Sequence, residues 1–315
     1  MMEEKIKDTA LDSVLLGKKV ETDDLFESLK MDELEELMKD EEGENNEIED
    51  VFNVEMNENE IQTLNEIGNG YSSKVFQGIY KGKKKVAIKV FNDYSASKRE
   101  KETLQFLNHP NVIKMFGFIK EGLFYTKLVL EKHDLDLKKH YEENKISKED
   151  SFHFSFQCSK AISFLHDNLV LHGDIKPANF LVKRSSNQVV ISDFGFSVKL
   201  TRFDQETFYN RGSYAYISPE TILKKVGCLA SDVYSFSIML SFLLTKEIPY
   251  KNKNLGNRDL ILQVAMHNLR PDIPMEIRNS SLGVLMMNCW KLDYLERPTM
   301  KNVMLYINNF CLEKF

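Results

Sequence analysis

Four polar side chains in the stretch 171–195 have the types and spacing that phosphoryl transfer requires. Asp174 and Asp193 stand nineteen residues apart, with Lys176 and Asn179 between them. An aspartate can orient or accept a hydroxyl proton, and an asparagine oxygen and a second carboxylate are hard ligands that suit Mg²⁺. A lysine can lie against a phosphoryl oxygen as a point charge. The alternative interpretation is a solvated loop before a hairpin, so the remaining elements must decide between the two.

A loop and a hairpin are predicted to position these side chains. The loop is 174–179, the two strands are 180–182 and 189–191, and the polar turn between them is 184–187. The second strand would return Asp193 to the side of the loop that carries Asp174.

A glycine turn and a strand lysine precede this stretch. Ile67-Gly68-Asn69-Gly70 indicates a strand that enters a tight turn, where glycine lets backbone amides approach phosphates closely. Such a turn by itself also marks an ordinary hairpin. The apolar strand 86–89 ends in Lys89, which needs an ionic partner or an anion because burying it unpaired is costly.

A helix is predicted over 95–107, before His109 and Pro110. Glu100 lies one turn before the apolar Leu104, so it is the candidate partner of Lys89, whereas Glu102 points away. The alternative is that both glutamates are exposed. Further strands are predicted over 112–118 and 124–130, and further helices over 150–167 and 233–244.

Charge is distributed unevenly over the 315 residues. Residues 1–60 contain 22 acidic and 6 basic side chains, a net charge of −16, and the remainder contains 26 acidic and 36 basic side chains, a net charge of +10. A basic folded body suits a protein that handles polyphosphate. Because no Lys/Arg block is interleaved with aromatic residues, no nucleic-acid partner is predicted.

The cysteine usage and the apolar runs indicate the compartment. Four widely separated cysteines show no metal-ligand spacing and predict a reducing environment, cytoplasmic or alternatively nuclear. No apolar run has membrane-spanning length, and no signal-peptide core stands at the start of the sequence.

The acidic segment 1–60 is predicted to be largely disordered, because its composition buries too little apolar surface to offset the entropy lost on ordering. A helix over 22–39 is the one element expected within it. Two interpretations stay open: an acidic helix that frays in solvent, or a docking helix for a partner or for the basic body of the same chain.

From about Ile61 to Phe310 the motifs together resemble those of eukaryotic protein kinases. They are the glycine turn at 67–70, VAIK ending at Lys89, the helix Glu100, HGDIKPAN at 172–179, DFG at 193–195, SPE at 218–220, SDVYSF from Ser231 and ERPT from Glu296. Their order and spacing follow the family. The resemblance implies an α+β, bilobal domain over 61–312, with a small antiparallel sheet and one helix in an N-lobe, 61–131, and a mainly helical C-lobe, 134–312.

The resemblance also implies cofactors, ATP and Mg²⁺, and a role for each matched position. The implied nucleotide contacts are Ile67, Gly68, Asn69 and Gly70 in the turn, Val75, Ala87 and Leu181 around the adenine, Leu130 as gatekeeper, the backbone of Glu131 and His133, and Lys89 with its partner Glu100. Asp174 would be the catalytic base, Lys176 would contact the γ-phosphate, and Asn179 and Asp193 would bind Mg²⁺. Two further roles concern the framework: Glu220 would pair with Arg297, and Asp232 would hold the catalytic loop, a simple N-cap role being the alternative.

The implied activity is phosphorylation of protein substrates on serine or threonine. Lys176-Pro177, Gly212-Ser213 and the CW…RPT ending resemble serine/threonine kinases of the tyrosine-kinase-like group. Two alternatives come from other classes. One is a small-molecule phosphotransferase of the aminoglycoside or choline type, which shares the His-Gly-Asp pattern. The other is a kinase-like scaffold or switch that binds ATP with little catalysis.

Two positions depart from the family pattern. Ser73 stands in place of the third glycine of the turn, which the first two glycines make tolerable. Gly173 stands where the family usually has the arginine that binds a phosphate on the activation segment. We therefore expect activity that does not depend on phosphorylation of Thr201, Thr207 or Tyr209.

Overall fold

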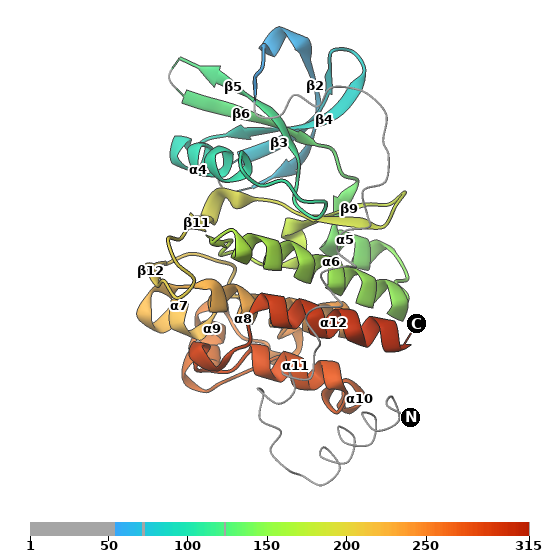
Figure 1. Ribbon diagram of the computed structural model, residues 1–315, viewed down its shortest axis with the longest axis vertical. Coiled ribbons are helices and arrows are strands. Elements are labelled where there is room, and N and C mark those ends of the chain that lie inside the picture. Colours follow the sequence, from blue (N-terminus) through green and yellow to red (C-terminus); the bar gives the residue numbers. More distant parts are fainter. Residues whose placement is uncertain (1–53, 71–72, 123, 315) are drawn as a thin grey trace. The chain divides into compact units, whose positions relative to one another are not determined.

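The computed structural model describes residues 54–70, 73–122 and 124–314, which fall within one compact unit of the chain, Asp50–Phe315. The helix predicted over 22–39 lies outside the described residues. The fold class is confirmed: a β-sheet with one helix forms the N-terminal lobe, and helices dominate the C-terminal lobe (Figure 1).

A six-stranded sheet forms the N-terminal lobe, with the strand order β1-β5-β6-β4-β3-β2. Its strands are β1 Val54–Glu55, β2 Ile61–Asn69, β3 Ser73–Tyr80, β4 Lys84–Phe91, β5 Met115–Glu121 and β6 Phe124–Glu131. The predicted strand 112–118 is shifted three residues along the chain. Its first part pairs elsewhere, because Val112 forms an isolated bridge with Ile191 and the Ile113 amide donates to the Ile191 carbonyl at 2.9 Å.

One face of this sheet collects the side chains implied for the nucleotide. Gly68 pairs with Val75, Val75 with Lys89, and Ala87 with Leu130. Directly opposed residues share a face, and so do residues two apart on one strand, so these five positions lie on one surface. The opposite face carries a buried core of Val86, Ile88, Phe116, Ile119 and Val129.

The strand β1 closes the outer edge of the sheet, upstream of the predicted domain start at residue 61. Val54 pairs in parallel with Gly117, and the Met56 amide donates to the Phe118 carbonyl at 2.8 Å. A Cβ at position 117 would overlap the Val54 carbonyl oxygen and lie 2.8 Å from Met56 Cγ, so the close approach of β1 needs glycine there. The short 3-10 helix η1, Glu58–Glu60, then leads into β2.

The helix α4, Tyr94–Leu104, packs on the sheet beside β6 (Figure 1). Asp93 caps its start by accepting a hydrogen bond from the Ser95 amide at 2.8 Å. It ends three residues before the predicted end at 107, well ahead of Pro110. Its inner face buries Glu100, Thr103 and Leu104, which places a carboxylate against the sheet lysine.

Helices make up most of the C-terminal lobe. They are α5 Leu137–Glu143, α6 Lys148–Asp167, α7 Pro219–Lys224, α8 Leu229–Thr245, α9 Asn257–Met266, α10 Met275–Arg278, α11 Ser281–Cys289 and α12 Met300–Lys314. The helix α6 packs against both α8 and α12. Thirteen residues of α8 are buried, as expected for a helix that is enclosed on all sides. No helix in the described ranges has both the length and the apolar character to cross a membrane.

Short strands and 3-10 turns connect the elements that follow β6. The strands are β7 Leu135–Asp136, β8 Val170–Leu171, β9 Phe180–Lys183, β10 Gln188–Ile191, β11 Val198–Lys199, β12 Thr207–Phe208 and β13 Val226–Gly227. The 3-10 turns are η2 Pro177–Asn179, η3 Phe194–Phe196, η4 Lys251–Lys253 and η5 Tyr294–Glu296. The predicted hairpin is confirmed, since β9 and β10 pair antiparallel in register from Phe180↔Ile191 to Lys183↔Gln188.

Candidate active site

Lys89 of β4 is the centre of a buried charged cluster. Its Nζ donates to both carboxylate oxygens of Glu100, at 2.8 and 2.6 Å, and to Asp193 Oδ1 at 2.8 Å. The Lys89 side chain is 7% exposed and that of Glu100 is fully buried. The alternative that both glutamates, Glu100 and Glu102, are exposed is therefore wrong. Glu102 instead lies at the surface, 3.8 Å from Lys98. The strand, α4 and the turn after β10 therefore meet at one ammonium group.

The charges in this cluster shift one another's pKa values. The neighbouring Lys89 lowers the pKa of Asp193 to about 2, and this carboxylate is still about half exposed, at 48%. Burial raises the pKa of Glu100 to about 7, against the pull of Lys89. Burial alone would lower the pKa of Lys89, but the carboxylates of Glu100 and Asp193 outweigh it and raise the pKa. The lysine stays charged, which an anion-binding group requires.

Asp174 is the centre of a second cluster, in the loop that ends at η2. Lys176 Nζ donates to Asp174 Oδ2 at 2.6 Å, and Asn179 Nδ2 donates to the same oxygen at 3.0 Å and to the Asp174 carbonyl at 2.7 Å. Ser213 Oγ donates to Asp174 Oδ1 at 2.8 Å and accepts from Lys176 Nζ at 2.8 Å. The carboxylate is thus held at both oxygens.

The hairpin brings the two clusters together, as its position in the sequence predicted. The Ser192 amide donates to the Asn179 carbonyl at 2.8 Å, and Ser192 Oγ donates to the same oxygen at 3.0 Å. The next residue, Asp193, has a φ of +65°, a left-handed conformation that turns its side chain away from the strand. The two candidate Mg²⁺ ligands, Asn179 and Asp193, are therefore joined through one serine.

Asp232 supports the loop backbone just before Asp174. Its Oδ2 accepts from the His172 amide at 2.8 Å, its Oδ1 accepts from the Gly173 amide at 2.9 Å, and His166 Nε2 lies 3.2 Å from Oδ2. The alternative that Asp232 is only an N-cap is wrong. The helix α8 begins at Leu229 with Cys228 as its N-cap, so Asp232 already lies inside the first turn.

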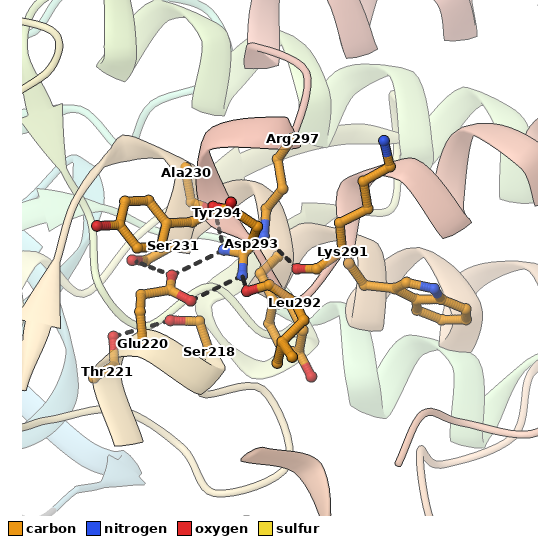
Figure 2. Close-up of polar contacts among 12 residues, drawn as sticks. Ser218, Glu220, Thr221, Ala230, Ser231, Lys291, Leu292, Asp293, Tyr294 and Arg297 are labelled. Carbon is orange, nitrogen blue, oxygen red and sulfur yellow. Dashed lines mark hydrogen bonds and ion pairs between the residues drawn. The ribbon is translucent and has the colours of Figure 1, made fainter. Parts of the chain in front are cut away.

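The predicted pair of Glu220 and Arg297 also forms. Nη1 and Nη2 of Arg297 each donate to a Glu220 oxygen at 2.8 Å, and Ser231 Oγ donates to Glu220 at 2.7 Å (Figure 2). Arg297 further donates to the carbonyls of Ala230 and Lys291, each at 2.9 Å. The pair joins the start of α7, the start of α8 and the turn before α12.

The remaining predicted positions line the sheet face and the connector between the lobes. Gly70 closes the turn by donating to the Ser73 carbonyl at 2.8 Å; Ile67 and Asn69 lie on β2. Glu131 ends β6, and its Oε2 lies 3.4 Å from Nε2 of the buried His133. Leu181 lies on β9, opposite Val190. These placements are compatible with the implied nucleotide contacts, which stay predictions.

Two contacts were not expected from the sequence. The double contact of Ser213 with Asp174 and Lys176 spans about forty residues, and only the Gly212-Ser213 motif hinted at a role. Arg99 of α4 donates to the Gly195 carbonyl and so ties the helix to the Asp193 turn a second time. Arg99 lies in a helix rich in polar residues, so the sequence alone does not distinguish it from the exposed residues beside it.

Fold and site together are those of a protein kinase domain, and the model of the protein kinase domain family matches residues 61–306. The chain belongs to this family. It is 31% identical over 269 residues to stress-activated protein kinase alpha of Dictyostelium discoideum, which covers 79% of this chain and 41% of that protein. A probable serine/threonine-protein kinase of the same organism is 30% identical over 275 residues, covering 83% of this chain and 16% of the relative.

A third relative comes from an animal. A putative mitogen-activated protein kinase kinase kinase 7-like protein of Drosophila melanogaster is 27% identical over 241 residues, which is 69% of this chain and 58% of that protein. The chain spans less than two thirds of the length of each of these three relatives.

Proposed function

We propose that this chain transfers the γ-phosphoryl group of ATP to serine or threonine hydroxyls of protein substrates. The observation that carries the proposal is the joining of two clusters, Lys89–Glu100–Asp193 and Asp174–Lys176–Asn179, through the Ser192 backbone. The relative named as a probable serine/threonine-protein kinase supports the same activity.

The donor set fits a metal-bound triphosphate. The amide nitrogen of Asn179 donates to Asp174, so its amide oxygen can bind a cation. Oδ1 of Asp193 accepts a hydrogen bond from Lys89, so its Oδ2 can bind the same cation. Mg²⁺ is commonly held by one or two such protein ligands together with phosphate oxygens. Bound there, Mg²⁺ would supply neutralisation of phosphate charge, and Lys89 would supply a further cation beside it.

The residues around Asp174 account for the transfer step. A substrate hydroxyl that approaches Asp174 can donate its hydrogen bond to the carboxylate, which orients the oxygen for attack on the γ-phosphorus. As the new P–O bond forms, the bond to the bridging oxygen of the leaving diphosphate breaks, and the hydroxyl proton passes to Asp174. Lys176, held 2.6 Å from Asp174, can stabilise the charge on the transferred group.

Several finer assignments belong to the same proposal. We place the chain in the tyrosine-kinase-like group and in signal transduction on the motifs described above. We place it in the cytoplasm, with the nucleus as the alternative, on its cysteine usage. Docking of a partner on the acidic segment stays a prediction, because residues 1–53 of that segment lie outside the described residues.

The test is phosphate transfer from labelled Mg²⁺-ATP, measured in parallel on a generic protein substrate, on the chain itself and on amino-alcohol and aminoglycoside acceptors. Label on protein serine or threonine that disappears in Asp174→Asn supports the proposal. Label on the small acceptors would indicate the metabolite phosphotransferase. Nucleotide binding without transfer to any acceptor would indicate the scaffold.

A further inference from the structure

The side chain of Tyr209 fills the space next to Gly173, the residue before Asp174. Tyr209 is 5% exposed. A Cβ at position 173 would overlap the Tyr209 hydroxyl and lie 3.0 Å from its Cε2. Gly173 also has a φ of +77°, in the region that favours glycine. A larger residue at 173 and the tyrosine ring therefore exclude each other in this arrangement.

A second glycine lies against the other end of the same side chain. A Cβ on Gly227 of β13 would lie 2.7 Å from Tyr209 Cβ and 2.8 Å from its Cγ. The backbone is fixed there as well, because the Tyr209 amide donates to the Lys225 carbonyl at 2.7 Å and β12 pairs with β13. Two glycines from separate segments thus leave room for one ring.

The ring also contacts the segment that follows Asp193. The Tyr209 hydroxyl donates to the Phe196 carbonyl at 3.1 Å. The ring is buried in a cluster with Leu171 and Leu200, and this burial raises the pKa of its hydroxyl above the usual range. One side chain therefore touches the catalytic loop, the turn after Asp193 and β13.

The space that remains beside Gly173 is small. The cavity lined by Gly173, Tyr209, Arg211 and Asp232 has a volume of about 10 Å³. This is about the room that one water molecule needs, so neither an arginine side chain nor a phosphate group fits there while the ring is in place.

We propose that Tyr209 is a positioning residue that keeps the catalytic loop in its working arrangement without phosphorylation of the activation segment. Gly173, which the ring presses against, donates to Asp232 at 2.9 Å and precedes Asp174, so a shift of Gly173 displaces Asp174 directly. This inference rests on the proposed kinase function. It also assigns a structural role to a tyrosine that we counted among the phosphorylation candidates, because its side chain is buried.

The test compares three variants of the full chain. Tyr209→Ala should lower kcat about tenfold or more, because misplacement by about 1 Å is enough for such losses. Its dissociation constant for Mg²⁺-ADP should stay within about threefold, because the Lys89–Glu100 pair is formed between β4 and α4. Tyr209→Phe keeps the ring and should stay within a few-fold of wild type. Phe208→Ala, at a neighbour that is 80% exposed, is the matched control and should not change kcat.

A second route leaves the tyrosine unchanged. Gly227→Ala adds one methyl group against the ring and should lower kcat in the same direction as Tyr209→Ala. Amide hydrogen exchange should become faster over 171–175 and 205–212 in both variants, and this readout needs no catalysis. Unchanged exchange and unchanged kcat in Tyr209→Ala would overturn the proposal, as would an equal loss of nucleotide binding and of turnover. If the wild type transferred no phosphate but amide exchange still became faster in both variants, the result would count against the proposed kinase function and not against the positioning role of Tyr209.

Discussion

Arg297 and Glu220 form a doubly hydrogen-bonded ion pair (Figure 2) that is almost completely shielded from solvent, since their side chains are 0% and 2% exposed. The two residues are far apart in the sequence and join three turns of the C-terminal lobe. Because the guanidinium also binds two backbone carbonyls, the charges are well compensated and the geometry is fixed from several sides.

Removing one partner of this pair should destabilise the lobe strongly. Arg297→Met leaves the Glu220 carboxylate buried without its cation, so we expect the free energy of unfolding to fall by about 3–5 kcal/mol. Denaturant unfolding measures this change. The double variant Arg297→Met/Glu220→Leu should lose less than the two single losses combined, and a control at the surface pair, Lys253→Met, should lose under about 1 kcal/mol.

Glu100 is expected to act through Lys89. Glu100→Gln is nearly isosteric but removes the charge that orients the lysine, so kcat/KM for ATP should fall about tenfold or more. The matched control is Glu102→Gln on the same helix, because Glu102 lies at the surface beside Lys98. Steady-state kinetics with varied ATP separate the two. Equal effects of both substitutions would contradict the role that the geometry gives to Glu100.

Ser213 is expected to hold both Asp174 and Lys176 in place. Ser213→Ala removes two hydrogen bonds of 2.8 Å and should lower kcat about 10- to 100-fold. Ser213→Thr keeps the hydroxyl and should retain activity within a few-fold of wild type. Turnover with a saturating protein substrate is the measurement, and full activity in the alanine variant would rule out the contact as a functional one.

His109 makes stability depend on pH. Its ring stacks on Phe164 with centroids 4.6 Å apart, and its Nδ1 accepts a hydrogen bond from the Asn111 amide at 3.0 Å, which only the neutral ring can do. Burial, with a smaller effect of Lys160, lowers the pKa of His109 from 6.5 to about 4. The folded protein therefore binds this proton less readily than the unfolded chain.

The sign of the effect follows from that difference. The contribution of His109 is fully present above pH 6.5 and is lost as the pH falls towards 4. We expect a loss of about 1–2 kcal/mol over this window after allowance for solvent screening. His109→Phe keeps the stacking and should flatten the slope, which urea unfolding at several pH values measures. An unchanged slope in that variant would assign the acid sensitivity to other groups.

Most of the site could be predicted from the motifs, because each motif also determines the local strand, turn or loop in which its residues lie. The hairpin over Phe180 to Ile191 followed from strand residues on both sides of a polar turn, and its pairing returns Asp193 to the loop as expected. Lys89 and Glu100 could be paired in advance because a buried lysine requires a counter-ion and only one glutamate faces inward.

The remaining features depend on contacts between distant segments. The sequence showed that Gly173 lacks a side chain, but the ring that occupies the vacated space comes from a residue 36 positions later. The start of α8 was placed too late because Cys228 is not a preferred capping residue and the apolar run becomes regular only after Asp232. In both cases the local sequence pattern is ambiguous, and contacts between distant segments determine the structure.

The edge strand β1, Val54–Glu55, is linked through β5 to the helix that carries Glu100. Glu55 pairs with Phe118, and the ammonium group of Lys101 on α4 lies 4.7 Å from the centre of the Phe118 ring. The edge strand and the residue next to Glu100 are therefore linked through the backbone and the ring of Phe118.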